Sequence, residues 1–473
     1  MSNNNQKNKA LVVGTLTYAI GNFGTKILSF LIVPLYTFYI LPEDLGDYDL
    51  LMTTVSLLSP LLTMKISDAA YRWIISDKEH TDITIATTYQ LLFQNCAFAS
   101  VLLLLINHFI PIWNCGYFIG ILIADRMLEC IQKLLRGLRN QKLFAVSGVF
   151  YTAVLVSLNF IKICIFHQGV DALLNSVLFS QLITISLIFV FEKRLRVFAL
   201  PKDFRKRQFE MLKYSVPLVP STLSWWVMSA SDRYVIRWMI GKAANGIFAV
   251  AHKFPTILQT IFLMFNNAWT DMALAELKQG KEGREYASKI FAYLYKFSFG
   301  MALVLIPLTK LVTRLVLSPK YQEASIYIGF IYLGTVFQGF SSFCSIGYLQ
   351  GKKTAGAAGT SIIGAGVNLV IDIITMRYIG LFAAAISTFA GFFAMWISRM
   401  HDIKKVFPID IDKKLFLFNL ILCIAMASLS IITDFFADII LSLLAATYFI
   451  IMNRDVLKKI VNKSMNKLFN RHR

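Results

Sequence analysis

Long apolar stretches recur along almost the whole chain, from Leu11 to Met452. At 1.5 Å per residue, a helix of about 20 residues crosses a hydrocarbon layer of ~30 Å, and these stretches are long enough to do so. No water inside a bilayer can bond to exposed backbone groups, so each stretch must be a helix unless it belongs to a closed barrel. The alternating pattern of barrel strands is not seen. The sequence therefore predicts an all-α, multi-pass membrane protein.

The composition agrees with this fold class. Of the 473 residues, 56% are apolar and 16% are charged, whereas about a quarter of the residues in an ordinary soluble domain are charged. Fourteen transmembrane helices are predicted, with approximate spans 11–40, 46–75, 84–110, 113–135, 142–166, 171–191, 214–240, 246–272, 290–317, 324–349, 355–376, 380–400, 415–432 and 436–452.

The 47 Lys and Arg residues give a net charge of +20, which could suggest a nucleic-acid ligand. Their distribution argues for a membrane instead. With the N-terminus inside, the inner segments hold about 33 of them and the outer loops about four, as the positive-inside rule requires. Both termini are therefore predicted in the cytoplasm, and no nucleic-acid partner is expected.

Motifs for catalysis and cofactor binding are not found. The chain has no GxxxxGK[ST] phosphate loop, its six cysteines lie singly without metal-ligand spacing, and its six histidines are dispersed. We therefore expect no cofactor, no metal site and no enzymatic activity. The alternative from a different class is a membrane-embedded polysaccharide polymerase or acyltransferase, which needs a large outer loop or a clustered His and Asp/Glu constellation.

Internal similarity predicts two related halves. A shift of about 200 residues sets 41–58 against 240–258, with Gly46 opposite Gly246, and residues 134–150 resemble 348–364. Transporters are commonly built from such repeats, with the substrate site between them. The predicted organisation is an N-terminal lobe 1–191 (helices 1–6), a basic cytoplasmic linker 192–213, a C-terminal lobe 214–400 (helices 7–12), two further helices in 401–452 and a basic tail 453–473.

Charged residues inside the predicted helices are the candidate functional residues. A charge at mid-membrane costs roughly 2.5–3.5 kcal/mol, so such residues usually face a cavity or a partner. The deep cations outnumber the deep anions, which predicts a wet, cationic cavity and a substrate that carries phosphate or several negative charges. The candidate substrate-binding residues are Lys26, Arg72, Arg233 and Lys253. Lys65 and Arg126 are weaker candidates because carboxylates lie near them, and Arg237 is weaker because it lies at the edge of its helix.

Without a nucleotide site, energy must come from an ion gradient or from removal of the product. A buried carboxylate could carry a coupling proton or sodium ion. Asp125 with Glu129 is the preferred pair. The alternatives are Asp68, Asp232, Asp271 and Asp372.

Two further expectations concern contacts. Adjacent residues on a helix point about 100° apart, so Asp232 and Arg233 should not face one partner together, and Arg233 should face the cavity. Lys310 and Arg314 lie within about two turns of a helix end and are expected to reach the membrane interface by snorkelling.

Two stretches carry a family resemblance: GTLTYAIGNFGTKILSFLIVPLYTFYILPEDLGDYDLL (14–51) and ASDRYVIRWMIGKAANGIFAVAHKFPTIL (230–258). With the fourteen-helix count, they resemble the polysaccharide transporter branch of the multidrug/oligosaccharidyl-lipid/polysaccharide exporter superfamily, the Wzx-type oligosaccharide flippases. The resemblance implies a V-shaped pair of six-helix lobes around a cavity that opens alternately to each side.

The resemblance also implies a substrate. It would be an undecaprenyl-diphosphate-linked oligosaccharide, the repeat unit of O-antigen, capsule or exopolysaccharide, moved to the outer leaflet of the bacterial cytoplasmic membrane. A polysaccharide polymerase and other biosynthetic membrane proteins are candidate partners. Within the same superfamily, a lipid II flippase stays open as an alternative, whereas a cation-driven drug exporter would favour an acidic cavity.

Overall fold

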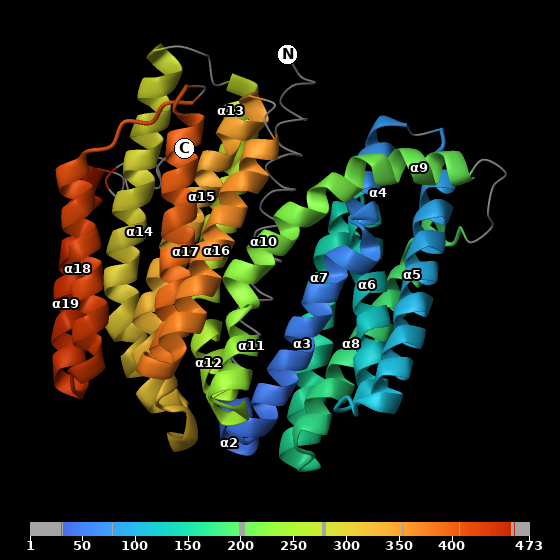
Figure 1. Ribbon diagram of the computed structural model, residues 1–473, viewed down its shortest axis with the longest axis horizontal. Coiled ribbons are helices and arrows are strands. Elements are labelled where there is room, and N and C mark those ends of the chain that lie inside the picture. Colours follow the sequence, from blue (N-terminus) through green and yellow to red (C-terminus); the bar gives the residue numbers. More distant parts are fainter. Residues whose placement is uncertain are drawn as a thin grey trace, which may run out of the picture. The chain divides into compact units, whose positions relative to one another are not determined.

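The computed structural model describes residues 30, 32–77, 79–197, 204–276, 281–351, 354–405, 407–455 and 458, which are helical over most of their length and contain no strand. In these ranges, nine single helices are long and apolar enough to cross a membrane, or up to eleven spans if each bent helix pair counts as one. The all-α, multi-pass class predicted from the sequence is therefore confirmed (Figure 1).

The chain divides into two compact units, residues 1–226 and 227–473. The helices of the first are α2 (Val33–Tyr39), α3 (Pro42–Thr63), α4 (Ile66–Ser76), α5 (Thr81–Phe109), α6 (Cys115–Gly137), α7 (Gln141–Phe160), α8 (Val170–Phe191) and α9 (Phe204–Ser215). The unit boundary lies inside α10 (Val219–Ala230). The second unit continues with α11 (Asp232–Met239), α12 (Lys242–Lys253), α13 (Thr256–Glu276), α14 (Lys281–Val316), α15 (Ala324–Gly351), α16 (Thr354–Ile379), α17 (Leu381–Asp402), α18 (Lys413–Ile432) and α19 (Phe435–Met452).

Every predicted span after the first coincides with one of these helices or with a broken pair of them. Most of the predicted span 11–40, including Lys26, lies outside the described residues. The predicted lobe and linker boundaries stay a prediction.

Two predicted spans are helix pairs that bend sharply at a break in the described part of the chain. α3 and α4 meet at 53°, because Met64 and Lys65 both adopt left-handed backbone conformations with φ of 45° and 56°. α12 and α13 meet at 45° around Pro255, whose ring cannot donate a helical hydrogen bond and clashes with the preceding turn. At each break the last carbonyls of the first helix lie next to a lysine in the sequence, Lys65 at the first break and Lys253 at the second.

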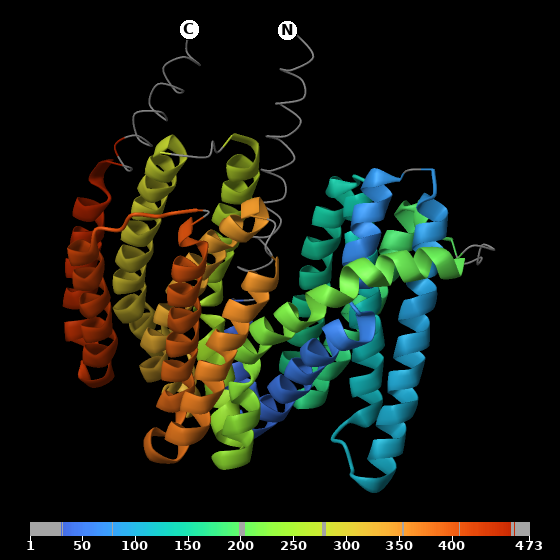
Figure 2. The same ribbon diagram turned by 45° about the horizontal axis from the view of Figure 1, so that its top comes forward.

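The core of the first unit joins α4, α5, α6 and α9. Ile74, Leu134, Leu135 and Met211 are fully or almost fully buried in one cluster. Figures 1 and 2 both show α9 lying crosswise to α5, at the end of the helices rather than along them. Met211 thus fixes a basic helix, α9, to the ends of α4 and α5.

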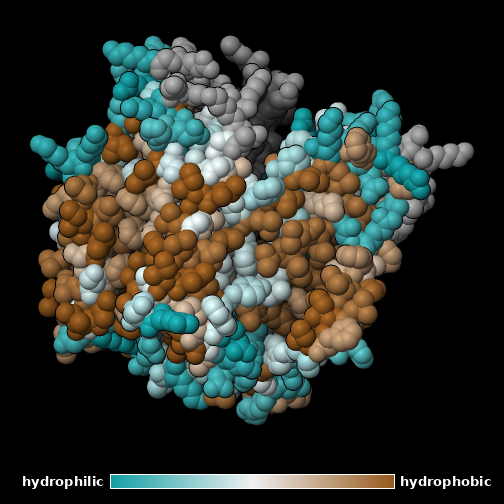
Figure 3. Space-filling view, viewed as in Figure 1, coloured by the Kyte–Doolittle hydropathy of each residue, from teal (hydrophilic) through white to brown (hydrophobic). Residues whose placement is uncertain are grey.

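The second unit has an aromatic core. Phe299, Phe337, Phe340 and Trp396 pack edge-to-face or tilted at centroid distances of 5.3–6.2 Å, and Trp396 stacks on Phe416 of α18 at 5.1 Å. Such pairs each contribute about 0.5–1.5 kcal/mol beyond the burial of their area. In the face seen in Figure 3, apolar side chains cover the middle of each unit and hydrophilic ones its ends, as a bilayer requires.

The predicted snorkelling of Lys310 and Arg314 is wrong for Lys310, which is 3% exposed. Its Nζ donates to the carbonyl of Thr433 at 2.7 Å and to that of Ser430, and lies 3.6 Å from the carboxylate of Asp438. Arg314 lies 3.2 Å from the same carboxylate. The two cations instead bind the turn between α18 and α19, because that turn offers unpaired carbonyls and a buried anion.

Candidate functional site

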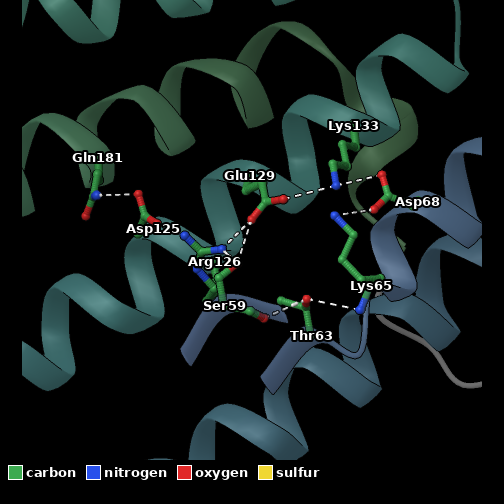
Figure 4. Close-up of polar contacts among 9 residues, drawn as sticks. All are labelled: Ser59, Thr63, Lys65, Asp68, Asp125, Arg126, Glu129, Lys133 and Gln181. Atoms are coloured by element: carbon green, nitrogen blue, oxygen red, sulfur yellow. Dashed lines mark hydrogen bonds and ion pairs between the residues drawn. The ribbon is translucent and has the colours of Figure 1, made fainter. Parts of the chain in front are cut away.

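An ion-pair network runs along α4 and α6 of the first unit (Figure 4). Lys133 Nζ lies 2.7 Å from Asp68 and 3.0 Å from Glu129, and Lys65 Nζ lies 2.8 Å from Asp68. Arg126 binds Glu129, Asp125 and the hydroxyl of Ser59. The network therefore continues from the break between α3 and α4 to the middle of α6.

Helical spacing explains why these charges meet. Arg126, Glu129 and Lys133 lie at i, i+3 and i+7 on one stripe of α6, and Asp68 of α4 reaches that stripe. The six ionised residues are three cations and three anions, so the network neutralises itself. Lys65 and Arg126 are paired with carboxylates in this network, which is the reason given above for treating them as weaker substrate ligands. Their role in substrate binding stays a prediction.

Lys133 is a member of this network that the sequence reasoning missed. It is not among the candidate residues named from the sequence, but α6 continues to Gly137 and carries Lys133 as a helical residue. The signal that could have found it is the Glu-to-Lys spacing of four residues from Glu129, which favours a helical ion pair.

The preferred coupling pair, Asp125 and Glu129, is engaged by cations. Arg126 binds both carboxylates, and Asp125 also accepts a hydrogen bond from Gln181 of α8 at 3.0 Å. Both carboxylates therefore already have a cation as partner inside the first unit. Their role in coupling stays a prediction.

Among the candidate cations in the described residues, Arg72 and Lys253 have exposed side chains. Arg72 lies 4.5 Å from the ring centroid of Tyr214 and 5.8 Å from that of Trp73, and Lys253 ends α12 at its break. Both side chains are exposed, and neither has a carboxylate within ion-pair distance among the described residues. These two can offer charge to an anionic ligand.

Asp232 and Arg233 form an ion pair with each other, at 2.6 Å. The expectation that they would face different partners was wrong, because the long Arg233 side chain turns back toward the carbonyl of Ser229, 3.3 Å away, and so reaches the carboxylate of its neighbour. His252 of α12 lies 3.8 Å from the same carboxylate. Arg233 is 6% exposed, so its charge is largely balanced inside the unit. Arg237 is half-buried one turn further on.

Beside this pair is a group of buried oxygen atoms. Asn368 of α16 accepts a hydrogen bond from Ser231 (3.4 Å) and donates one to Ser387 of α17 (3.2 Å). Asp372, one turn further along α16, is 0% exposed and close enough to Asp232 for their charges to interact. Neither of its carboxylate oxygens has a hydrogen bond of normal geometry in the described part of the chain.

The orphaned carboxylate of Asp372 is the clearest chemical signal in the second unit. The hydroxyl of Ser387 on α17 donates to the carbonyl of Ala384 at 3.0 Å. A buried charge without a partner is costly, so such a group takes up a proton or a small cation. Among the described residues no group of three or more His, Cys, Asp or Glu side chains is arranged to hold a metal ion.

Comparison with known proteins gives one family match. The family described as polysaccharide biosynthesis protein matches residues 11–270. An uncharacterized membrane protein of Methanocaldococcus jannaschii is 25% identical over 185 residues. That match covers 39% of this chain and 35% of the relative, so the chain matches only about a third of the length of that protein.

The fold is shared with solved transporter structures. The lipid II flippase MurJ in an inward closed conformation has a TM-score of 0.71 at 14% identity, covering 94% of this chain and all of MurJ. An inward-facing multidrug resistance MATE transporter of the MOP superfamily scores 0.62 at 15% identity, covering 88% of this chain and 98% of that one. A Vibrio cholerae MATE transporter, VcmN, scores 0.59 at 13% identity, covering 84% and 98%.

Proposed function

Because the chain belongs to the polysaccharide biosynthesis protein family and has the fold of MOP-superfamily transporters, we propose that it is a flippase for lipid-linked oligosaccharides. The substrate is an undecaprenyl-diphosphate-linked repeat unit of O-antigen, capsule or exopolysaccharide. It moves from the cytoplasmic to the outer leaflet of the cytoplasmic membrane, with both termini of the protein in the cytoplasm.

Two exposed cations, one in each unit, carry the proposal. Arg72 and Lys253 are exposed and lack carboxylate partners among the described residues, whereas Lys65, Arg126 and Arg233 are balanced by acids. Arg and Lys are the usual ligands of phosphate. Either position can pair with the negative charge of a diphosphate headgroup, and the isoprenoid tail can stay in lipid.

The first test removes these cations in the host cell. Arg72→Ala and Lys253→Ala are expected to reduce surface polysaccharide and to accumulate intact lipid-linked repeat units on the cytoplasmic face, at normal levels of the protein in the membrane. Arg205→Ala removes an exposed cation of α9 and serves as the control. Normal surface polysaccharide in both test variants would contradict the proposal, and unpolymerised units outside the cell would indicate a polymerase.

We assign the coupling cation, a proton or Na⁺, to Asp372 together with Asp232. The assignment is supported by the burial of Asp372 and by its unbonded oxygens, because an ion site between helices needs carboxylate and other oxygen ligands that the protein leaves unused. Asn368 and Ser387 supply neutral oxygen atoms beside it.

The coupling test uses purified protein in proteoliposomes. Wild-type transport should respond to a sodium or a proton gradient, and Asp372→Asn should remove that response. The control, Asp410→Asn, changes an exposed carboxylate of the same unit and should leave it intact. A gradient response retained by Asp372→Asn would rule out this assignment.

Lipid II is a second candidate substrate, favoured by the fold match to the lipid II flippase MurJ. Its headgroup is also a lipid-linked diphosphate, so the same cations would bind it. The two substrates are separated by asking whether the protein sustains growth of cells depleted of their own lipid II flippase. Growth would favour lipid II, whereas lysis together with loss of surface polysaccharide in a deletion strain would favour the oligosaccharide.

A further inference from the structure

The basic helix α9 is held against the first unit by one of its faces. Met211 and Ser215 are fully buried, and Arg207 lies 2.6 Å from Asp77, which lies between the end of α4 and the start of α5. α5 is a candidate membrane span, and α9 lies crosswise to it at the helix ends (Figures 1 and 2). In a bilayer that α5 crosses, α9 therefore lies at the level of the lipid headgroups.

The opposite face of α9 combines cations with an apolar side chain. Lys206, Phe209 and Lys213 lie at i, i+3 and i+7, which places them on one stripe of the helix. All three side chains are exposed, and Phe209 is 70% exposed. Val216, the residue that follows α9, is exposed as well. A large aromatic ring and two ammonium groups thus share a face that the first unit does not cover.

The two lysines of this stripe keep their charge. Neither has a carboxylate within ion-pair distance in the described ranges of the chain. Glu210, the one acid of α9, lies 3.8 Å from Arg207 instead. The stripe therefore presents positive charge outward, beside an apolar ring.

A membrane surface with anionic lipids matches both properties of the stripe. Lysine stems lie along apolar surface and carry their ammonium groups to the level of the phosphates, and helices that lie in the interface insert aromatic side chains at the boundary of the acyl chains. Anionic headgroups supply the opposite charge.

We propose that the exposed stripe of α9 binds anionic phospholipids of the leaflet at which α9 lies. Lys206 and Lys213 contact the phosphate groups, and the ring of Phe209 inserts between the lipids. The inference goes beyond the proposed function and is independent of the transported substrate. Because α9 leads through residues 216–218 into α10, where the boundary between the two units lies, the lipid surface holds one end of the connection between the units.

The test follows amide hydrogen exchange of α9 in the full-length protein, reconstituted in nanodiscs. One set of discs contains only phosphatidylcholine, and the other an equal mixture of phosphatidylcholine and phosphatidylglycerol. The wild-type amides of α9 should exchange more slowly in the mixture, and high salt should remove this difference because it screens surface charges. Lys206→Gln and Lys213→Gln should each reduce the difference about fivefold, the effect of one lysine near an anionic surface.

Matched variants separate this charge effect from packing. Lys142→Gln removes an exposed lysine at the start of α7 in the same unit and should keep the wild-type difference. Glu210→Gln removes the exposed acid of α9 and should increase it. Unchanged exchange of α5 and α6 in each variant establishes that the packing of Met211 in the core is intact.

Phe209 tests the apolar part of the stripe. Phe209→Ser should speed exchange of α9 several-fold in both kinds of nanodisc, because the insertion of an apolar side chain does not depend on lipid charge. Phe209→Leu keeps an apolar side chain and should retain most of the protection.

Three outcomes would overturn the proposal. The first is equal exchange of wild-type α9 in the two kinds of nanodisc. The second is a difference that both lysine variants retain in full, since the anionic lipid would then act elsewhere on the protein. The third is wild-type exchange of Phe209→Ser in both lipids, because the ring would then face water.

Discussion

The buried ion cluster at the end of α14 allows a quantitative prediction. Asp438 is 0% exposed and lies 3.2 Å from Arg314 and 3.6 Å from Lys310, and it accepts a hydrogen bond from Thr433 at 2.5 Å. At an effective dielectric constant of about 20, each of the two ion pairs contributes roughly 5 kcal/mol of Coulomb attraction. The free-energy cost of removing these charges from water offsets most of that attraction in the folded state. For Lys310 this cost remains when its partner Asp438 loses its charge.

Asp438→Asn keeps the side-chain volume and removes the charge. Since Lys310 stays buried, we expect a loss of about 3–5 kcal/mol, typical of breaking one side of a buried pair. For a unit of this size such a loss lowers the melting temperature by roughly 10 °C. The measurement is thermal unfolding of the detergent-solubilised protein, followed by the fluorescence of Trp396 and its neighbours in the aromatic core.

A matched control is available in the same unit. Arg284 of α14 binds Asp410 with a bidentate pair at 2.6 and 2.7 Å, but both side chains are exposed, so Asp410→Asn should leave the melting temperature almost unchanged. Adding Lys310→Met to Asp438→Asn should restore part of the stability, because the uncompensated cation is then gone. A melting temperature for Asp438→Asn equal to that of Asp410→Asn would refute the reasoning.

Two further changes test packing and surface charge. A methyl group at Gly364 would lie 2.9 Å from a backbone oxygen of α17, so Gly364→Ala should cost about 1–3 kcal/mol, whereas Gly359→Ala, with open space around it, should be neutral in the same thermal unfolding assay; equal melting temperatures would contradict the packing role. Beyond α4, hydrogen bonds from His80 and Arg207 hold the pKa of Asp77 below its ordinary value, so the bond between Asp77 and α9 persists above about pH 4 and is lost only as the pH falls through the lowered pKa. Amide hydrogen exchange of α9, corrected for intrinsic rates, should therefore be the same at pH 5 and pH 8 and faster at both in Asp77→Asn; a strong pH dependence in the wild type would contradict this.

The helices were predictable because length and hydropathy determine them. A stretch of about 20 apolar residues has few alternatives in a bilayer, and the spans from 46 to 452 fall on observed helices or helix pairs. The positions of the helix breaks were harder to predict from the sequence. Pro255 signals one of them, but Met64 and Lys65 adopt left-handed conformations that no glycine or proline marks, so only packing around them can account for the other.

Charge partners were predictable within a helix and not between helices. The stripe of Arg126 and Glu129 follows from their spacing, and so does the pair of Lys65 with Asp68. The pairing of Lys310 with Asp438 joins residues that are distant in sequence, and nothing in the local pattern of α14 distinguishes that contact from snorkelling. The orphaned oxygens of Asp372 are likewise a property of the packed unit, because a sequence shows a carboxylate but not the absence of its partners.

The helix breaks give a reason for cations to stand where they do. A broken helix leaves carbonyls without intrahelical partners at the end of its first segment, and the partial negative charge of that end favours a cation. Lys65 follows the end of α3 and Lys253 ends α12, so each occupies such a position. Lys65 is also bound by Asp68, whereas Lys253 is exposed. The same local rule therefore produces a structural cation in one unit and, by our proposal, a ligand-binding cation in the other, and the difference between them is the neighbouring carboxylate.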